Sequence, residues 1–299
     1  MTLTHESSEQ AAPSRASQPV PLPFLEGNEL ENYKLHRRFD RMGRLIGDAK
    51  MKKLMDAHVM IIGLGGVGSY AAEMIVRSGV GKVTLVDFDQ ICITNVNRQL
   101  HAMQGVIGKY KSEILAERFS KVNPKAEIIP INKFYNYEHA DEILAHHPDY
   151  VIDAIDSVTS KAHLLNQCKQ RGIKVICSAG AGGRMDPTMI RVADLGKTTV
   201  DPLARMIRKI LRTKYGHPKD QPFGIPTVFS NEPVREPVEL AYDGGKGFRC
   251  VCPQGNNEYF TCDNRNLILG TAGFVTGTFG FTCASVVVRH ITDDLVWSL

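Results

Sequence analysis

The stretch that decides the fold reads VMIIGLGGVGSY and spans residues 59–70. Its first four residues are apolar, which predicts a short buried β-strand. Three glycines follow at the spacing Gly63-x-Gly65-x-x-Gly68, and residues 70–78 carry a helical pattern of apolar side chains. In a strand–turn–helix unit of this kind, the free backbone amides at the helix N-terminus bind phosphate groups. The stretch therefore predicts a nucleotide site at the edge of a parallel sheet.

The same alternation of strand and helix continues along the first half of the chain. Further strands are expected at residues 82–86, 126–131, 150–153 and 174–178. Helices are expected at residues 37–56, 109–122, 139–146 and 160–171. Strands that alternate with helices predict an α/β fold, here a Rossmann-like, mostly parallel sheet with helices on both faces.

The pattern weakens after residue 183. Residues 201–212 predict an amphipathic helix, and the prolines that recur at 215–237 predict an irregular excursion or a mobile loop. Residues 1–28 are rich in Ser, Gln, Pro and Ala, which predicts a disordered tail rather than a signal peptide. We expect a single domain over residues 29–299, with a core at about 36–183 and an irregular or antiparallel C-terminal extension at about 184–299.

The composition is usual for a soluble globular protein, with 43% hydrophobic and 23% charged residues among 299. The seven cysteines include no C-x-x-C pair, which favours a reducing, cytoplasmic location. The formal net charge of +4 fits a polyanionic partner without requiring one. Residues 267–288 are uncharged over a length that could cross a membrane. Four threonines and four glycines in that stretch favour a buried strand–helix unit, so no membrane association is expected.

Charged residues follow the predicted strands, at the sheet edge where ligands of parallel sheets bind. Asp87 ends the second strand, where a carboxylate can accept hydrogen bonds from ribose hydroxyls. The glycines and Asp87 alone also suit a dinucleotide-dependent oxidoreductase. Arg98 and Lys111 favour ATP chemistry instead, because negative charge builds up on the α-phosphorus when it is attacked. Asp156 follows the strand at 150–153, where a carboxylate can hold Mg²⁺.

Five motifs of the first half occur in the order of a known family. They are GLGGVGS at 63–69, DFD at 87–89, NVNRQ at 95–99, GKYK at 108–111 and IDAID at 152–156. Together they resemble the adenylation core of the ThiF/MoeB/ubiquitin-activating superfamily. The resemblance implies ATP and Mg²⁺ as cofactors, with the nucleotide bound by Gly63, Gly65, Gly66, Gly68, Asp87, Asp89, Asn95, Arg98, Gln99 and Lys111. It implies catalytic roles for Arg98, Lys111, Asp156 and Arg41, with Mg²⁺ on Asp156.

Arg41 carries a further implication of the same resemblance. The matching family arginine reaches into the site of the partner subunit, so we expect a homodimer. Three nearby residues have simpler interpretations. Asp89 also suits a role in ordering the loop that follows it, Asp153 favours a structural role, and His101 favours packing over acid–base catalysis.

Motifs of the second half narrow the resemblance to one branch of the superfamily. AGAGGRMDPT at 179–188, DLGKT at 194–198, VFSNE at 228–232 and GFVTGTFGF at 273–281 are similar to tRNA threonylcarbamoyladenosine dehydratases. The resemblance implies a tRNA substrate whose threonylcarbamoyl carboxylate is adenylated by ATP, with loss of pyrophosphate and then of AMP on ring closure. Basic residues that suit tRNA contact, or only a solvated helix face, are Arg184, Arg205, Arg208, Lys209 and Arg212.

Three alternatives remain open. An adenylyltransferase for a sulfur-carrier protein would need a partner that ends in Gly-Gly and would commonly bind zinc through C-x-x-C pairs, which this chain lacks. The other two alternatives, a Rossmann oxidoreductase and a scaffold without activity, rank behind this adenylyltransferase. The sequence leaves undecided the role of Cys250, Cys252 and Cys262, the binding of a sulfur-transfer partner, and the choice among tRNAs.

Overall fold

A strand at the predicted place, β1 (His58–Ile62), lies near the middle of a seven-stranded sheet. The computed structural model describes residues 37–238, 240 and 269–294. The strands stand in the order β3-β2-β1-β4-β5-β7-β6. The other strands are β2 (Lys82–Val86), β3 (Glu127–Ile131), β4 (Tyr150–Asp153), β5 (Lys174–Ser178), β6 (Ile190–Asp194) and β7 (Pro226–Ser230).

The strand order reverses between β1 and β4. From β1 the chain crosses to β2 and β3 on one side, and then returns to β4 and β5 on the other. All neighbouring pairs are parallel except β6 with β7, which confirms a mostly parallel sheet with an antiparallel C-terminal part. Ile62 stands opposite both Val86 and Asp153, so the carboxyl ends of these strands meet at one edge. Open α/β sheets bind ligands at such a reversal.

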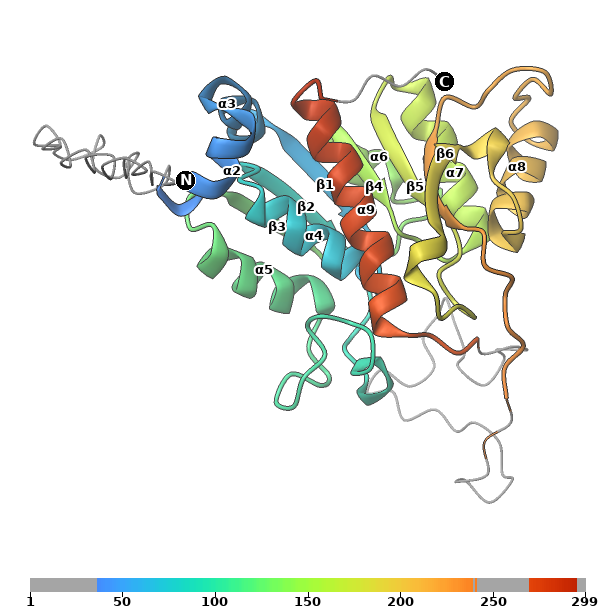
Figure 1. Ribbon diagram of the computed structural model, residues 1–299, viewed down its shortest axis with the longest axis horizontal. Coiled ribbons are helices and arrows are strands. Elements are labelled where there is room, and N and C mark those ends of the chain that lie inside the picture. The colour runs from blue at the N-terminus through green and yellow to red at the C-terminus, as the bar shows by residue number, and fades with distance from the viewer. Residues whose placement is uncertain (1–36, 239, 241–268, 295–299) are drawn as a thin grey trace, which may run out of the picture. The chain divides into compact units, whose positions relative to one another are not determined.

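Helices cover both faces of the sheet, as the alternating pattern predicted (Figure 1). One face carries α4, α5 and α9, and α4 packs against both α5 and α9. The other face carries α7, which packs against β4, β5 and α8. The helices are α2 (Asp40–Ile46), α3 (Asp48–Asp56), α4 (Gly68–Arg77), α5 (Lys111–Val122), α6 (Ala140–Leu144), α7 (Val158–Gln170), α8 (Pro202–Thr213) and α9 (Gly273–Ile291).

Two predicted segments differ from the structure. The helix expected at 37–56 is divided into α2 and α3 at Gly47, whose φ of 82° is left-handed. The excursion expected at 215–237 contains a regular strand, β7, with Pro226 at its first position. Proline is tolerated at the start of a strand, where its missing N–H costs little. The frequency of proline in this region therefore concealed a strand that pairs with both β5 and β6.

The uncharged C-terminal stretch forms α9, an interior helix. Among the described residues, α9 is the one helix long and apolar enough to cross a membrane by length and composition, and 56% of it is buried. It packs against α4, β4, β5 and β7. The ring of Phe281 meets Tyr70 of α4 edge-on, with the ring centroids 5.7 Å apart. The helical part of the expected strand–helix unit is as predicted, but residues 269–272, which precede α9, form no strand, and residues 267 and 268 lie outside the described residues.

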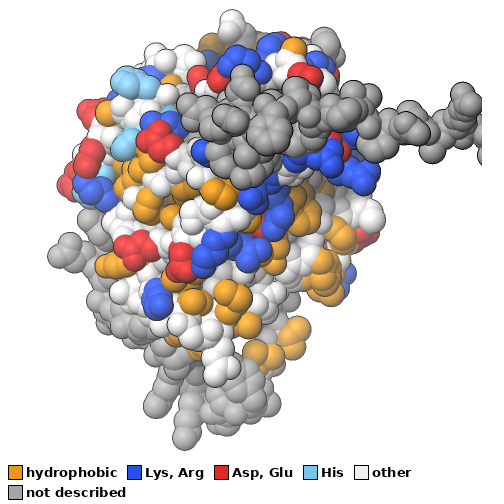
Figure 2. All heavy atoms as spheres, turned by 90° about the vertical axis from the view of Figure 1, so that its left-hand side faces the viewer, with side chains coloured by type: hydrophobic (Ala, Val, Ile, Leu, Met, Phe, Trp, Pro, Cys, Tyr) orange, Lys and Arg blue, Asp and Glu red, His pale blue; other side chains and the backbone are white. Residues whose placement is uncertain are grey.

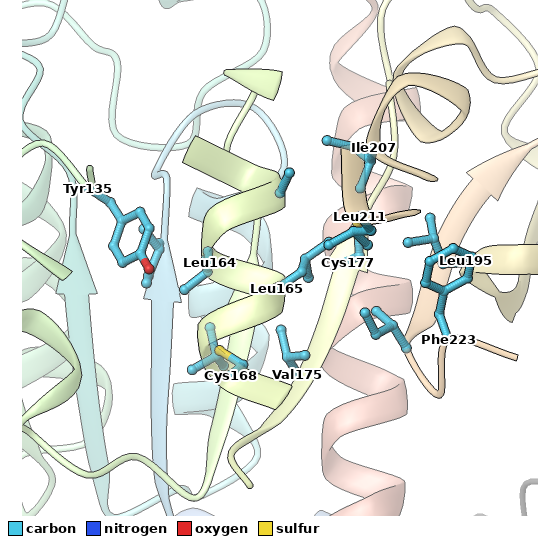
Figure 3. Close-up of a cluster of buried hydrophobic side chains, with 14 of the residues drawn as sticks. Tyr135, Leu164, Leu165, Cys168, Val175, Cys177, Leu195, Ile207, Leu211 and Phe223 are labelled. Atoms are coloured by element: carbon cyan, nitrogen blue, oxygen red, sulfur yellow. The ribbon is translucent and has the colours of Figure 1, made fainter. Parts of the chain in front are cut away.

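A hydrophobic core fills the space between the sheet and α7 and α8 (Figure 3). Leu164 and Leu165 of α7 and Ile207 and Leu211 of α8 are fully buried in it, and Phe223 closes one end. The described cysteines are all buried, at Cys92, Cys168, Cys177 and Cys283. Burial raises the pKa of the Cys168 thiol to about 12, which suits the predicted packing role rather than a nucleophile.

Candidate nucleotide site

The glycine loop lies between β1 and α4 at the strand-order reversal. Gly63 has a φ of 89°, and a Cβ placed on it would lie 2.7 Å from the carbonyl oxygen of Ala154. A Cβ on Gly66 would lie 2.9 Å from Oγ1 of Thr276, in the first turn of α9. Glycine is therefore needed for the loop to pass close to β4 and α9. The amide of Ser69, in the first turn of α4, bonds the carbonyl oxygen of Gly65 at 3.1 Å, and the positive end of the helix dipole faces the loop.

Asp87 connects the glycine loop to the end of β2. Its Oδ2 accepts a hydrogen bond of 2.6 Å from the amide of Leu64, and its Oδ1 accepts one of 2.8 Å from Asp89. The side chain is 8% exposed. Burial raises the pKa of Asp87, while the charge of Lys111 opposes that rise. Asp87 thus holds the glycine loop in place from the carboxyl end of β2.

Lys111, at the first position of α5, brings a buried cation to the two acidic residues. It is 5% exposed and donates a hydrogen bond of 2.6 Å to Oδ2 of Asp89. Burial acts to lower the pKa of Lys111, but the charges of Asp87 and Asp89 outweigh it, so the pKa is raised. The charge of Asp156 adds to the rise. Lys111 is therefore positively charged and lies within electrostatic reach of all three carboxylates.

The segment after β2 adds polar groups to the same edge. It contains the short helix η1 (Ile93–Asn95), where Oδ1 of Asn95 accepts a hydrogen bond of 3.0 Å from the Cys92 amide. Arg98 Nη1 donates to the carbonyl oxygen of Thr94 at 2.9 Å. Gln99 is 7% exposed, and its Oε1 has no hydrogen-bond partner among the described residues. A buried amide oxygen without a partner suits a site that a ligand completes.

His101 is buried beside this segment with 1% of its surface exposed. Neither ring nitrogen has a hydrogen-bond partner within the described chain. Burial, with the charge of Lys111, lowers the pKa of His101 to about 3. The ring is therefore neutral near pH 7 and serves as a packed residue, as the sequence interpretation favoured, rather than as a proton donor.

The loop between β4 and α7 presents Asp156, which is exposed. Asp153, at the end of β4, is buried and pairs with Lys161 of α7 at 2.9 Å. This pairing agrees with the structural role favoured for Asp153. Lys161 also donates a hydrogen bond of 2.9 Å to the carbonyl oxygen of Ile155, so the pair anchors the loop next to Asp156. Asp156 is thus an exposed carboxylate on a fixed loop.

Except for Arg184, the remaining predicted basic residues lie on two helices, α2 and α8. Arg41 is exposed on α2, and Arg205 and Lys209 are exposed on α8. Arg208 is half-buried and bonds the carbonyl oxygen of Thr198 at 3.1 Å, while Arg212 lies over the ring of Phe223. On α8, the basic residues recur at a spacing of three and four residues and so share one face of the helix, and burial, together with the charges of Arg212 and Arg205, lowers the pKa of Arg208.

Arg184 differs from the other basic candidates because it is 2% exposed. Its Nη2 bonds Oδ2 of Asp201 at 2.8 Å, and its other donors reach carbonyl oxygens of Gly180, Gly182 and Glu232. Asp201 in turn caps α8 through the Ala204 amide. Arg184 therefore ties the loop after β5 to α8 as a buried side chain, which differs from the surface position that tRNA contact would require.

Two residues near the site were not singled out by sequence. Thr276 contacts the glycine loop only because α9 folds back from the far end of the chain. The sequence could have predicted a buried ion pair at Lys161, because a lysine within the apolar face of a helix is seldom buried without a charged partner. Cys250, Cys252 and Cys262 lie outside the described residues, and no group of three or more metal-binding side chains occurs among those described.

Comparison with known proteins identifies the family. The model of the ThiF family matches residues 39–295. The tRNA threonylcarbamoyladenosine dehydratase of Haemophilus influenzae is 41% identical over 265 residues, which cover 88% of this chain and 95% of that protein. The crystal structure of the Escherichia coli tRNA N6-threonylcarbamoyladenosine dehydratase in complex with ATP is 35% identical, with a TM-score of 0.74, and the match covers 87% of this chain and 95% of that one.

A second kind of relative matches less of the chain. The molybdopterin-synthase adenylyltransferase of Escherichia coli is 32% identical over 133 residues, which cover 44% of this chain and 52% of that protein. The similarity to the dehydratases is thus both higher and more extensive. The chain belongs to the ThiF family and, within it, to the tRNA threonylcarbamoyladenosine dehydratases.

Proposed function

We propose that this chain uses ATP to dehydrate threonylcarbamoyladenosine in tRNA and to close its side chain into a ring. The observation that carries the proposal is the extent of similarity. The match to the dehydratases spans most of both chains, whereas the match to the adenylyltransferase spans less than half of this chain. Adenylation of a sulfur-carrier protein is therefore the second, less supported candidate.

The chemistry needs a carboxylate to become an acyl donor. Attack of the threonylcarbamoyl carboxylate on the α-phosphorus of ATP releases pyrophosphate and forms a mixed anhydride with AMP. A nucleophilic atom of the same side chain then attacks the activated carbonyl carbon, and AMP leaves. The effective molarity of an intramolecular reaction favours the second step, so no nucleophile from the protein is required. This agrees with the burial of every cysteine in the described ranges.

Different residues of the site would contribute to different parts of this reaction. The glycine loop and the N-terminus of α4 would bind phosphates, and Asp87 would accept hydrogen bonds from the ribose. Lys111 and Arg98 would stabilise the charge that develops on the α-phosphate. The proposed nucleotide contacts are Gly63, Gly65, Gly66, Gly68, Asp87, Asp89, Asn95, Arg98, Gln99 and Lys111.

Asp156 is the proposed ligand of Mg²⁺. The ion commonly takes one or two carboxylates together with substrate phosphates and water, so a single exposed carboxylate at the phosphate site fits its needs. The effect of Asp156 on the pKa of Lys111 supports its closeness to the nucleotide site. When bound, the ion would neutralise part of the charge of the triphosphate.

We also propose a cytoplasmic homodimer in which Arg41 enters the partner's site. Arg41 is exposed on α2, as a residue that acts outside its own subunit must be. Figure 2 views the molecule from the side on which α2 and α3 lie in Figure 1, and Lys and Arg side chains there adjoin hydrophobic ones. Arginine is enriched at subunit interfaces, so an exposed arginine on this side fits the proposed contact. A sulfur-transfer partner stays a prediction.

Mass spectrometry of nucleosides tests the proposal. The enzyme is incubated with ATP, Mg²⁺ and tRNA that carries threonylcarbamoyladenosine. The expected result is loss of one water from that nucleoside, dependent on ATP and abolished by Arg98→Ala. An unchanged nucleoside, with ATP–pyrophosphate exchange only when a carrier protein ending in Gly-Gly is added, would favour the adenylyltransferase instead.

A further inference from the structure

A cluster of one lysine and two tyrosines lies at the surface where the end of α8 meets the loop between β3 and α6. We call Tyr137, Lys214 and Tyr215 the tyrosine–lysine patch. The hydroxyl groups of the two tyrosines are 2.8 Å apart, and Lys214 donates a hydrogen bond to Tyr137. The Lys214 ammonium also lies 4.7 Å and 5.6 Å from the centroids of the two rings. Three groups that can donate hydrogen bonds therefore converge at one point of the surface.

Core packing accounts for only one member of the patch, Tyr215, which is half-buried and packs against the hydrophobic core. Tyr137 is 48% exposed and Lys214 is exposed, so both keep their polar groups in water. The inner side of the patch nevertheless packs against buried side chains. The ring of the buried His163 lies 4.1 Å from that of Tyr137, and its Nδ1 is 3.3 Å from the hydroxyl oxygen of Tyr135. Burial and the charge of Lys214 both lower the pKa of His163. The neutral form of His163 is therefore favoured, and Lys214 carries the positive charge of the patch.

The position of the patch relates it to the nucleotide site. The loop that carries Tyr137 leaves the carboxyl end of β3, and that end lies on the edge of the sheet that carries the site. His163, beneath it, lies in the second turn of α7, the helix that begins two residues after Asp156. Five residues of helix span only about 8 Å. A polynucleotide whose reacting base occupies the site therefore has backbone phosphates within reach of the patch.

We propose that the tyrosine–lysine patch binds a backbone phosphate of the tRNA next to the modified adenosine, an inference that rests on the proposed function. A phosphate oxygen accepts hydrogen bonds from an ammonium and from hydroxyl groups, and positive charge beside aromatic rings is typical of surfaces that bind single-stranded RNA. The patch adds a contact from α8 and the β3–α6 loop that is independent of the ATP contacts.

The test compares Lys214→Ala and the double variant Tyr137→Phe, Tyr215→Phe with wild type, using tRNA and a short RNA stem–loop, both carrying threonylcarbamoyladenosine. Lys121→Ala is the matched control, since Lys121 is an exposed lysine of α5 on the opposite face of the sheet. For Lys214→Ala, loss of one charged phosphate contact should weaken binding of either RNA about 5- to 8-fold at 0.1 M salt and reduce the slope of log Kd against log salt by about 0.7–0.9. The double tyrosine variant removes hydroxyl donors but no charge, so it should weaken binding without changing that slope. The KM for ATP should not change.

Two results would overturn the inference. One is a Kd for tRNA that equals that of wild type in both patch variants, which would leave the surface to a protein partner. The other is weaker binding of tRNA but not of the stem–loop, which would place the contact far from the modified adenosine. Failure of the proposed function is a separate result, because wild type itself would then leave the nucleoside unchanged.

Discussion

Lys161 and Asp153 form an ion pair in which neither side chain is exposed to solvent, with Nζ 2.9 Å from Oδ1. Burial acts to lower the pKa of Lys161, but the charge of Asp153 outweighs it and raises the pKa. The same ammonium bonds the backbone carbonyl oxygen of Ile155. The pair therefore does more than compensate two buried charges, since it also fixes the loop that presents Asp156.

Lys161→Met should destabilise the fold by about 3–5 kcal/mol in the free energy of unfolding, because it leaves a buried carboxylate without a partner. The double variant Lys161→Met, Asp153→Leu should regain most of that stability, because no unpaired charge remains. It should not regain turnover, because the bond to Ile155 is still missing. Urea unfolding and nucleoside mass spectrometry measure the two effects. A double variant as active as wild type would contradict the anchoring role.

Asp156→Asn should reduce turnover with Mg²⁺-ATP by about 100-fold or more, the scale expected when a metal contact to the reacting phosphates is lost. Its side chain is exposed, so the free energy of unfolding should change by no more than about 0.5 kcal/mol. Steady-state kinetics and urea unfolding check both statements. Asp220→Asn, at another exposed position, is the control and should keep full activity. Normal turnover by Asp156→Asn would remove the metal assignment.

His101 should make the stability of the protein depend on pH. Its pKa in the folded protein is about 3, and its ordinary value is 6.5. As pH falls below 6.5 the unfolded chain takes up a proton that the folded protein does not, so stability is lost between pH 6.5 and pH 3. Between pH 7 and pH 5, wild type should lose about 2 kcal/mol more than His101→Gln. Urea unfolding at both pH values measures the difference, and equal losses would show that the ring is not held neutral.

The first five strands could be predicted within one residue, because apolar runs between helical patterns leave few alternatives. The nucleotide residues were found through local motifs that the parallel sheet brings to one edge. Contacts between distant segments could not be found in this way. Thr276 meets the glycine loop only through the packing of α9 on α4. From the sequence, Arg184 is interpreted as a cation on the protein surface. In the structure it is buried and paired with Asp201, which also caps α8, and neither contact is evident from the sequence.

Arg41 provides the sharpest test of the proposed homodimer. Arg41→Ala and Asp156→Asn should each be inactive alone, because every site then lacks one of the two groups. In a mixed dimer, one site combines an intact Asp156 with the intact Arg41 of the other chain. Equal mixing makes half of the dimers mixed, so about a quarter of the wild-type activity should return. Differently tagged chains, purified through both tags, confirm that exchange took place. Mixed dimers without activity would show that Arg41 does not act in the partner's site.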